Sequence, residues 1–125
     1  MEYARRAREQ AYCPYSHFAV GAALLTADGT ICTGCNIENA SYSLGVCAER
    51  TAVFKAVSEG KRKFSAIAVC GAPEGESPDK PCIPCGACLQ VLAQFCVDDL
   101  PVILSDGVHP LKEFLPVRFT MTEQE

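Results

Sequence analysis

Residues 47–59 read CAERTAVFKAVSE, and this stretch organises the rest of the chain. The apolar side chains that recur along one helical face are Ala48, Ala52, Val53, Ala56 and Val57. Gly60 follows as a stop signal, so the pattern predicts a helix over 47–59 with one buried face. Such a face has to be covered by a sheet or by another helix.

Strand patterns flank this helix on both sides. Residues 18–25 and 31–37 are rich in apolar and β-branched side chains, and Asp28-Gly29 between them is a strong hairpin signal. On the other side, residues 64–70 predict a buried strand, and residues 72–81 form a loop of Pro, Gly and acidic residues.

The remaining segments complete an alternating order. Helices are predicted over 2–12 and 85–95, a short strand over 102–104 and a helical turn over 110–115. Alternation of this kind favours an α/β fold, with helices on both faces of one sheet. With no internal repeat and no linker, the pattern predicts a single domain over residues 1–125.

Charge and hydropathy argue against two classes of partner. Apolar residues make up 49% of the chain and charged residues 21%, and the formal net charge is -4. An acidic chain repels phosphate backbones, so we expect no nucleic-acid partner. No apolar run reaches the roughly 20 residues that span a bilayer, so we expect no membrane partner either.

Nine cysteines are an odd number in a chain whose N-terminus shows no secretory signal. The interpretation is a cytoplasmic protein with metal-bound and buried thiols rather than a disulfide scaffold. Cys13, Cys70 and Cys96 are expected to be small buried side chains. Cys32 and Cys35 lie three apart on a predicted strand and therefore face opposite sides, which makes them poor chelators.

Two short motifs predict a zinc site, Cys47-Ala48-Glu49-Arg50 and Pro84-Cys85-Gly86-Ala87-Cys88. Cys85 and Cys88 share one face at the start of a predicted helix, and Cys47 begins the other helix, where unpaired N–H groups favour thiolates. Three protein ligands leave the fourth zinc position open, as catalysis requires. If Cys82 instead closes the site as a fourth ligand, the zinc is structural. His17 and His109 lack a partner at ligand spacing.

Glu49 and Arg50 follow the first ligand directly. A carboxylate at position 49 can reach the open zinc position and move protons there; the alternative is a glutamate that stabilises the helix dipole. Zinc with three thiolates is net negative, and Arg50 could withdraw charge by donating hydrogen bonds to the sulfurs. The alternative for Arg50 is a surface position on the helix.

With two further stretches, PYSHFAVGAAL at 14–24 and GCNIENA at 34–40, the chain resembles the cytidine deaminases, in their small homotetrameric form with three zinc cysteines. The resemblance runs from about residue 14 to residue 119. It implies a three-layer α/β/α fold around a mixed sheet of about five strands. It also implies one zinc per chain, and four chains with shared active sites.

The resemblance also implies the role of each site residue. Asn36 and Glu38 bind the sugar, with Glu38 on the 3′-hydroxyl, and Phe18 packs against the base. The Ala48 N–H binds the pyrimidine carbonyl, and Glu49 contacts the base N3. Tyr42 and Phe119 enter a neighbouring subunit's pocket.

The function expected on this basis is hydrolytic deamination of cytidine and 2′-deoxycytidine to the uridine forms, with release of ammonia, in pyrimidine salvage. Two other readings stay open. One is a deaminase of another substrate, such as a blasticidin-type antibiotic, a nucleotide or a base in RNA. The other is a structural zinc module that uses Cys82.

Overall fold

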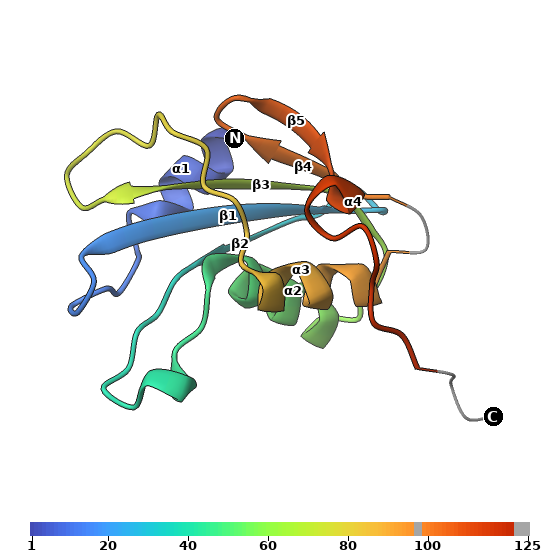
Figure 1. Ribbon diagram of the computed structural model, residues 1–125, viewed down its shortest axis with the longest axis horizontal. Coiled ribbons are helices and arrows are strands. Elements are labelled where there is room, and N and C mark those ends of the chain that lie inside the picture. The colour runs from blue at the N-terminus through green and yellow to red at the C-terminus, as the bar shows by residue number, and fades with distance from the viewer. Residues whose placement is uncertain (97–98, 122–125) are drawn as a thin grey trace.

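The structure is a computed structural model that describes residues 1–96 and 99–121. Its centre is a five-stranded sheet in the order β2-β1-β3-β4-β5 (Figure 1). The strands are β1 (Phe18–Thr26), β2 (Ile31–Cys35), β3 (Phe64–Pro73), β4 (Pro101–Leu104) and β5 (Gly107–Pro110). The β3–β4 pair is parallel and the other pairs are antiparallel, so the sheet is mixed as expected.

Helices cover both faces of this sheet, which confirms the three-layer architecture. The helices are α1 (Glu2–Arg8), α2 (Ala48–Ser58), α3 (Gly86–Gln94), the short α4 (Leu111–Phe114) and the single 3-10 turn η1 (Tyr42–Leu44). In Figure 1, α1 lies on one side of the sheet, and α2 and α3 lie side by side on the other.

The alternation of side chains along the strands divides the core between these two faces. Leu24, Ile67 and Val69 point toward α2 and α3, where they join the larger apolar cluster. Ala23 and Cys70 point the other way and pack in a smaller cluster with Ala4 of α1. Because the larger cluster fixes α2 and α3 on one face, it also fixes where their N-termini meet.

The close approach of α2 to β2 depends on Gly34. A Cβ at this position would lie 2.5 Å from the Ala48 carbonyl oxygen and 2.6 Å from the Ala52 nitrogen. The helix backbone therefore rests directly on the strand, and the first turn of α2 is held at a set depth against the sheet.

The first predicted helix is shorter than expected. It ends at Arg8 rather than at residue 12. The Arg8 guanidinium donates to the carbonyl oxygens of Ala19, Ala72 and Pro73, each at 2.9 Å. These bonds hold the end of α1 to the ends of β1 and β3, and the chain then turns toward β1.

Two further element predictions differ from the structure. Strand β2 ends at Cys35, and Ile37 forms isolated bridges with Tyr12 and Val46 instead. Strand β5 was not predicted, because Gly107-Val-His-Pro is short and mostly polar or turn-forming; it forms as an edge strand in a hairpin with β4. Within the described residues, no helix combines the length and apolarity needed to cross a bilayer.

Candidate active site

Three cysteines from two helix N-termini meet on the α2–α3 face of the sheet. Cys47 is the N-cap of α2, Cys85 is the N-cap of α3, and Cys88 lies in the first turn of α3. Their three Sγ atoms all lie within 4.8 Å of one another. The Sγ atoms of Cys47 and Cys85 lie 3.8 Å apart, and those of Cys85 and Cys88 lie 3.4 Å apart. The two motifs predicted from sequence are therefore brought together.

This sulfur cluster fits a zinc ion. Tetrahedral zinc with Zn–S bonds of about 2.3 Å places its sulfur ligands about 3.8 Å apart, close to the observed spacings. Cys88 is buried, whereas Cys47 and Cys85 border a cavity. Three thiol ligands with one side toward a cavity are the donor set of a zinc site that keeps a position for a reactant.

Hydrogen bonds within the cluster favour a thiolate at Cys47. The contact with the Cys88 thiol, followed by the contact with Arg50, lowers the pKa of Cys47 to about 5. The same contact with Cys47, together with burial, raises the pKa of Cys88. These contacts favour loss of the Cys47 proton, and zinc binding requires all three thiols to lose their protons.

Arg50 lies directly behind this cluster. Its Nη2 donates to the Cys47 Sγ at 3.4 Å, and this contact raises the pKa of the guanidinium. Its Nε is buried and has no hydrogen-bond partner among the described residues. The contact with sulfur places a permanent positive charge beside Cys47.

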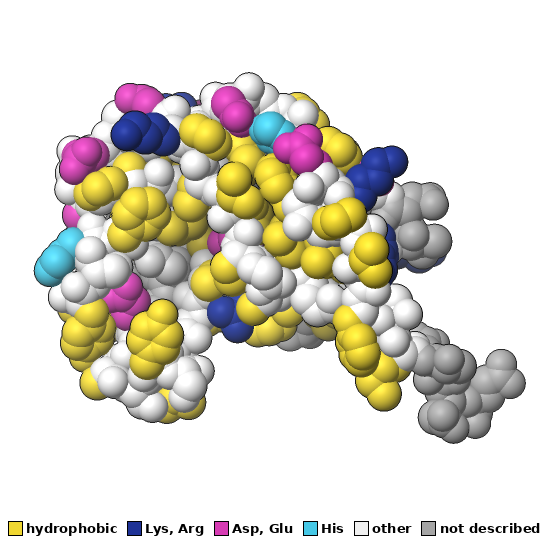
Figure 2. Space-filling model, in the orientation of Figure 1, with side chains coloured by type: hydrophobic (Ala, Val, Ile, Leu, Met, Phe, Trp, Pro, Cys, Tyr) yellow, Lys and Arg dark blue, Asp and Glu magenta, His cyan; other side chains and the backbone are white. Residues whose placement is uncertain are grey.

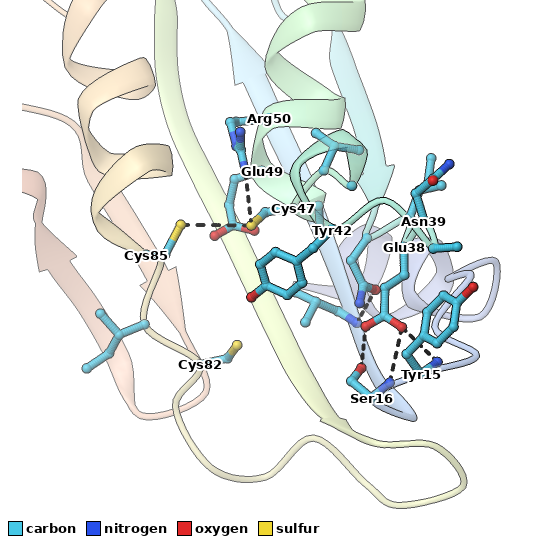
Figure 3. Close-up of a pocket in the computed structure, with 18 residues that line it drawn as sticks. Tyr15, Ser16, Glu38, Asn39, Tyr42, Cys47, Glu49, Arg50, Cys82 and Cys85 are labelled. Carbon is cyan, nitrogen blue, oxygen red and sulfur yellow. Dashed lines mark hydrogen bonds between the residues drawn. The ribbon is translucent and has the colours of Figure 1, made fainter.

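Glu49 lies on the cavity side of the cluster, with only 4% of its surface exposed (Figure 3). Burial, with a further contribution from the negative charge of Cys47, raises the pKa of Glu49 to about 6. A carboxyl group with this pKa can both accept and release a proton near neutral pH.

The cavity beside these groups has a volume of about 730 Å³, within the usual range of small-molecule sites. One end is formed by the N-terminus of α2, and the other by residues 15–16 and the loop 36–46. Figure 2 shows the hollow between this projecting loop and the body of the molecule.

Asn36 is held rigidly at the edge of the sheet. Its Oδ1 accepts from the Val20 N–H at 2.9 Å, and its Nδ2 donates to the Phe18 carbonyl oxygen at 2.8 Å. The amide keeps one N–H and one lone pair for a ligand in the cavity that it lines.

Glu38 is also held by hydrogen bonds at the sugar end of the predicted site. Its Oε1 accepts from the backbone N–H groups of Tyr15 (3.0 Å) and Ser16 (3.1 Å), and its Oε2 accepts from the Ser16 hydroxyl (Figure 3). Ser16 was not among the predicted site residues. It lies in the stretch 14–24, but serine in a turn carries no signal of its own.

Three predicted aromatic residues are placed less directly. Tyr42 lines the cavity but is 96% exposed. Phe18 does not line it; its ring packs over Gly71, near Cys82. Phe119 also lies outside it, and its backbone is bonded to the side chain of Gln90 on α3. Within one chain, only Tyr42 of the three borders the cavity.

The other candidate ligands lie elsewhere. Cys82 lines the cavity but is not part of the sulfur cluster, and burial raises its pKa to about 11. His17 pairs with Glu74, and His109 with Asp106 and Glu113. Within residues 1–96 and 99–121, no other group of three His, Cys, Asp or Glu side chains has metal-binding spacing.

Comparison with known proteins places this geometry in a family. The model of the cytidine and deoxycytidylate deaminase zinc-binding region matches residues 1–104. The chain is 59% identical to a cytidine deaminase of Sporosarcina psychrophila over 109 residues, which cover 87% of this chain and 76% of that protein. It is 51% identical to a cytidine deaminase of Halalkalibacterium halodurans over 120 residues, which cover 92% of this chain and 87% of that protein.

A solved structure gives the same result for the fold. The crystal structure of a cytidine deaminase from Burkholderia pseudomallei superimposes with a TM-score of 0.82 at 48% identity, covering 94% of each chain. Both the zinc-binding region and the fold that surrounds it are therefore shared. The chain belongs to the cytidine deaminase family of zinc-dependent hydrolases.

Proposed function

We propose that this chain, as a single domain over residues 1–125, catalyses hydrolytic deamination of cytidine and 2′-deoxycytidine. The products are uridine or 2′-deoxyuridine and ammonia, which is a step of pyrimidine salvage. The observation that carries the proposal is one cavity with two different ends. A three-thiol cluster with the buried Glu49 forms one end, and the amide of Asn36 and the carboxylate of Glu38 lie at the other, where they would bind hydroxyls.

One zinc ion per chain, held by Cys47, Cys85 and Cys88, would supply Lewis-acid activation of water. Glu49 would take the proton released from that water, deliver one to N3 of the base, and protonate the leaving amine. Burial, the largest contribution, raises the pKa of Glu49 above its usual value, which favours uptake of a proton during turnover. A buried carboxylate beside the cluster needs no large movement to serve each step.

Arg50 would offset the charge of the thiolate ligands. Three thiolates leave the zinc site net negative, which opposes removal of a proton from water. The hydrogen bond from Arg50 to Cys47 draws electron density away from one sulfur and so weakens that opposition.

The base and the sugar would be held by different elements. The Ala48 N–H lies in the first turn of α2, where it has no partner within the helix, and would donate to the pyrimidine carbonyl oxygen. Asn36 and Glu38 would bind sugar hydroxyls. Phe18 lies outside the cavity of the single chain, beside Gly71 and near the cavity-lining Cys82, so it would have to turn toward the cavity to pack against the base.

Charge in the cavity favours a nucleoside over a nucleotide. Glu38 is held ionised by its hydrogen bonds, so it repels a phosphate. Among the described residues that line the cavity, Arg50 is the one cation, and it is bonded to a cysteine of the zinc cluster.

Exposed apolar side chains support a homotetramer with shared active sites. Tyr42, Leu44 and Phe119 are 96%, 71% and 70% exposed, which is unusual for residues of this size. Tyr42 and Phe119 would complete the pocket of a neighbouring chain. We place the protein in the cytoplasm, because a cluster of three thiols suited to a metal has to stay reduced.

The test is a steady-state assay of deamination with cytidine, 2′-deoxycytidine, cytosine, CMP and blasticidin S. We expect turnover of the first two and much lower kcat/KM values for the other three. Cytosine lacks the hydroxyls for which the site is built, and CMP brings a phosphate close to Glu38. Preferred turnover of CMP or blasticidin S would overturn the nucleoside assignment.

A further inference from the structure

The carboxylate of Glu38 has almost no free hydrogen-bonding capacity. Oε1 accepts two backbone N–H groups, from Tyr15 and Ser16, and each carboxylate oxygen has about two lone-pair sites. Oε2 accepts the Ser16 hydroxyl and so keeps one site. A sugar hydroxyl can therefore bind Glu38 through Oε2 alone, in a direction that the Ser16 hydroxyl leaves open.

The Ser16 hydroxyl is itself oriented. Its Oγ accepts the Phe18 N–H at 3.1 Å while its own hydrogen points to Glu38. The Phe18 carbonyl oxygen accepts from Asn36 Nδ2. The peptide groups of Phe18 thus connect the two residues expected to bind the sugar, and Ser16 is the link on the Glu38 side.

The turn that carries Ser16 is held in an unusual conformation. His17 has a φ of 56°, a left-handed conformation that few non-glycine residues adopt. Its N–H donates to the Cys13 carbonyl oxygen at 2.9 Å, and its own carbonyl oxygen accepts from the Glu74 N–H at 2.8 Å. Local strain maintained by surrounding hydrogen bonds is typical of turns that position a functional group.

We propose that Ser16 is a positioning residue for the sugar subsite, whose hydroxyl fixes the Glu38 carboxylate so that Oε2 accepts the substrate's 3′-hydroxyl. This inference rests on the proposed function, because it assumes a nucleoside in the cavity. The charge state of Glu38 agrees with this geometry, because the Ser16 hydroxyl, and then the two backbone N–H groups, lower the pKa of its carboxyl group.

The test compares Ser16→Ala with Ser16→Thr, which keeps a hydroxyl, and with the control Ser77→Ala. Ser77 also donates to a carboxylate, that of Asp79, but it does not line the cavity. We expect Ser16→Ala to raise the KM for cytidine about tenfold with kcat little changed, since it removes a hydrogen bond to a charged group. Ser16→Thr should recover most of this loss, and Ser77→Ala should match wild type.

A second substrate and a double variant distinguish loss of Glu38 positioning from a general loss of activity. With 3′-deoxycytidine, which lacks the hydroxyl in question, Ser16→Ala should leave KM within about twofold of wild type. In a Glu38→Ala background, Ser16→Ala should have no further effect, because the two residues act as one unit. Equal losses with both nucleosides, or multiplicative losses in the double variant, would overturn the proposal.

A readout without turnover keeps this inference separate from the proposed function. The Glu38 carboxyl can be titrated by carbon-detected nuclear magnetic resonance of the free protein. Its pKa should rise in Ser16→Ala and stay unchanged in Ser77→Ala. If the pKa does not move, the positioning role is wrong even in an active enzyme; if it moves but cytidine is no substrate, the proposed function fails instead.

Discussion

Cys47 and Cys82 both border the cavity, but their surroundings give the two thiols opposite properties. Contacts with Cys88 and Arg50 lower the pKa of Cys47 to about 5, whereas burial raises the pKa of Cys82 to about 11. The pKa of Cys88 is raised as well, however, so protonation does not by itself exclude a thiol from the zinc site. Position separates the two: the Cys88 sulfur lies within 4.8 Å of those of Cys47 and Cys85, whereas Cys82 is not part of this cluster despite its C-x-x-C spacing from Cys85.

Replacing these cysteines one at a time tests this distinction. Cys82→Ser should retain one zinc per chain, because the three-sulfur cluster stays complete. Cys85→Ser should lose most of its zinc, since two thiols remain. Metal content measured by mass spectrometry after gel filtration gives the answer, and zinc lost from Cys82→Ser but kept by Cys85→Ser would favour the structural site.

Glu49 can be tested without changing the shape of the site. Glu49→Gln should keep the fold and the zinc but lose activity by more than the roughly 10²–10⁴-fold of one acid–base step, because one group serves several proton transfers. Steady-state kinetics with cytidine and parallel zinc analysis measure both effects. Turnover within tenfold of wild type would exclude the proposed shuttle.

Sequence spacing was sufficient to predict which three cysteines cluster, but it gave no indication of the contact between Ser16 and Glu38. Cys85 and Cys88 lie on one helical face whatever surrounds them, so their spacing predicts that they bind the same metal ion. Ser16 lies in a turn where the next residue, His17, has a positive φ, and its contact with Glu38 joins this turn to the loop after β2. Contacts of this kind depend on tertiary structure and leave no pattern in the chain.

Among the elements, α2 and α3 were predicted within one or two residues, and β5 was missed. The two helices carry regular apolar faces that the large core cluster covers. Strand β5 is an edge strand in which Gly107, Val108 and Pro110 are exposed. It can be identified from its pairing with β4 and not from an alternation of buried and exposed residues. Edge strands of this length are stabilised by their hairpin rather than by hydrophobic periodicity.

His109 of β5 contacts two carboxylates, Asp106 in the β4–β5 turn and Glu113 on α4. Its Nε2 lies 2.8 Å from Asp106 Oδ1 and its Nδ1 lies 2.8 Å from Glu113 Oε2, and the ring also contacts Phe114. Both ring nitrogens donate only when the imidazole is protonated. Asp106 first, and then Glu113, therefore raise the pKa of His109 above its usual value of 6.5.

This arrangement predicts a pH-dependent contribution to stability. The pKa of His109 is higher in the folded state than in the unfolded state. The stabilisation is therefore complete below about pH 6.5 and is lost as the pH rises through the folded-state pKa. His109→Gln should therefore lower the melting temperature at pH 5.5 more than at pH 9. In the background Asp106→Asn with Glu113→Gln that difference should vanish, and a difference that grows with pH would contradict the account.

At the scale of the whole molecule, the exposed aromatic residues call for a partner surface. Tyr42 borders the cavity while nearly all of its own surface stays open, and Phe119 lies outside the cavity of its own chain. These exposed rings are the observation behind the proposal of four chains with shared active sites.

Assembly into a tetramer and the sharing of active sites between chains can be tested together. Light scattering should give the mass of four chains of 13.4 kDa each. Tyr42→Ala and Glu49→Gln should each be impaired, and refolding them together should restore activity, because a hybrid site can take Glu49 from one chain and Tyr42 from its neighbour. An active monomer, or mixtures no better than the separate variants, would contradict shared sites.

The most direct test of the account measures zinc and product in the same sample. Cytidine is incubated with the purified protein, and uridine, ammonia and zinc per chain are quantified before chelation, after chelation and after zinc is returned. The account predicts uridine and ammonia in equal amounts, activity proportional to zinc up to one ion per chain, and recovery on return of the metal. Full activity in zinc-free protein, or a zinc-loaded protein that forms no uridine, would contradict it.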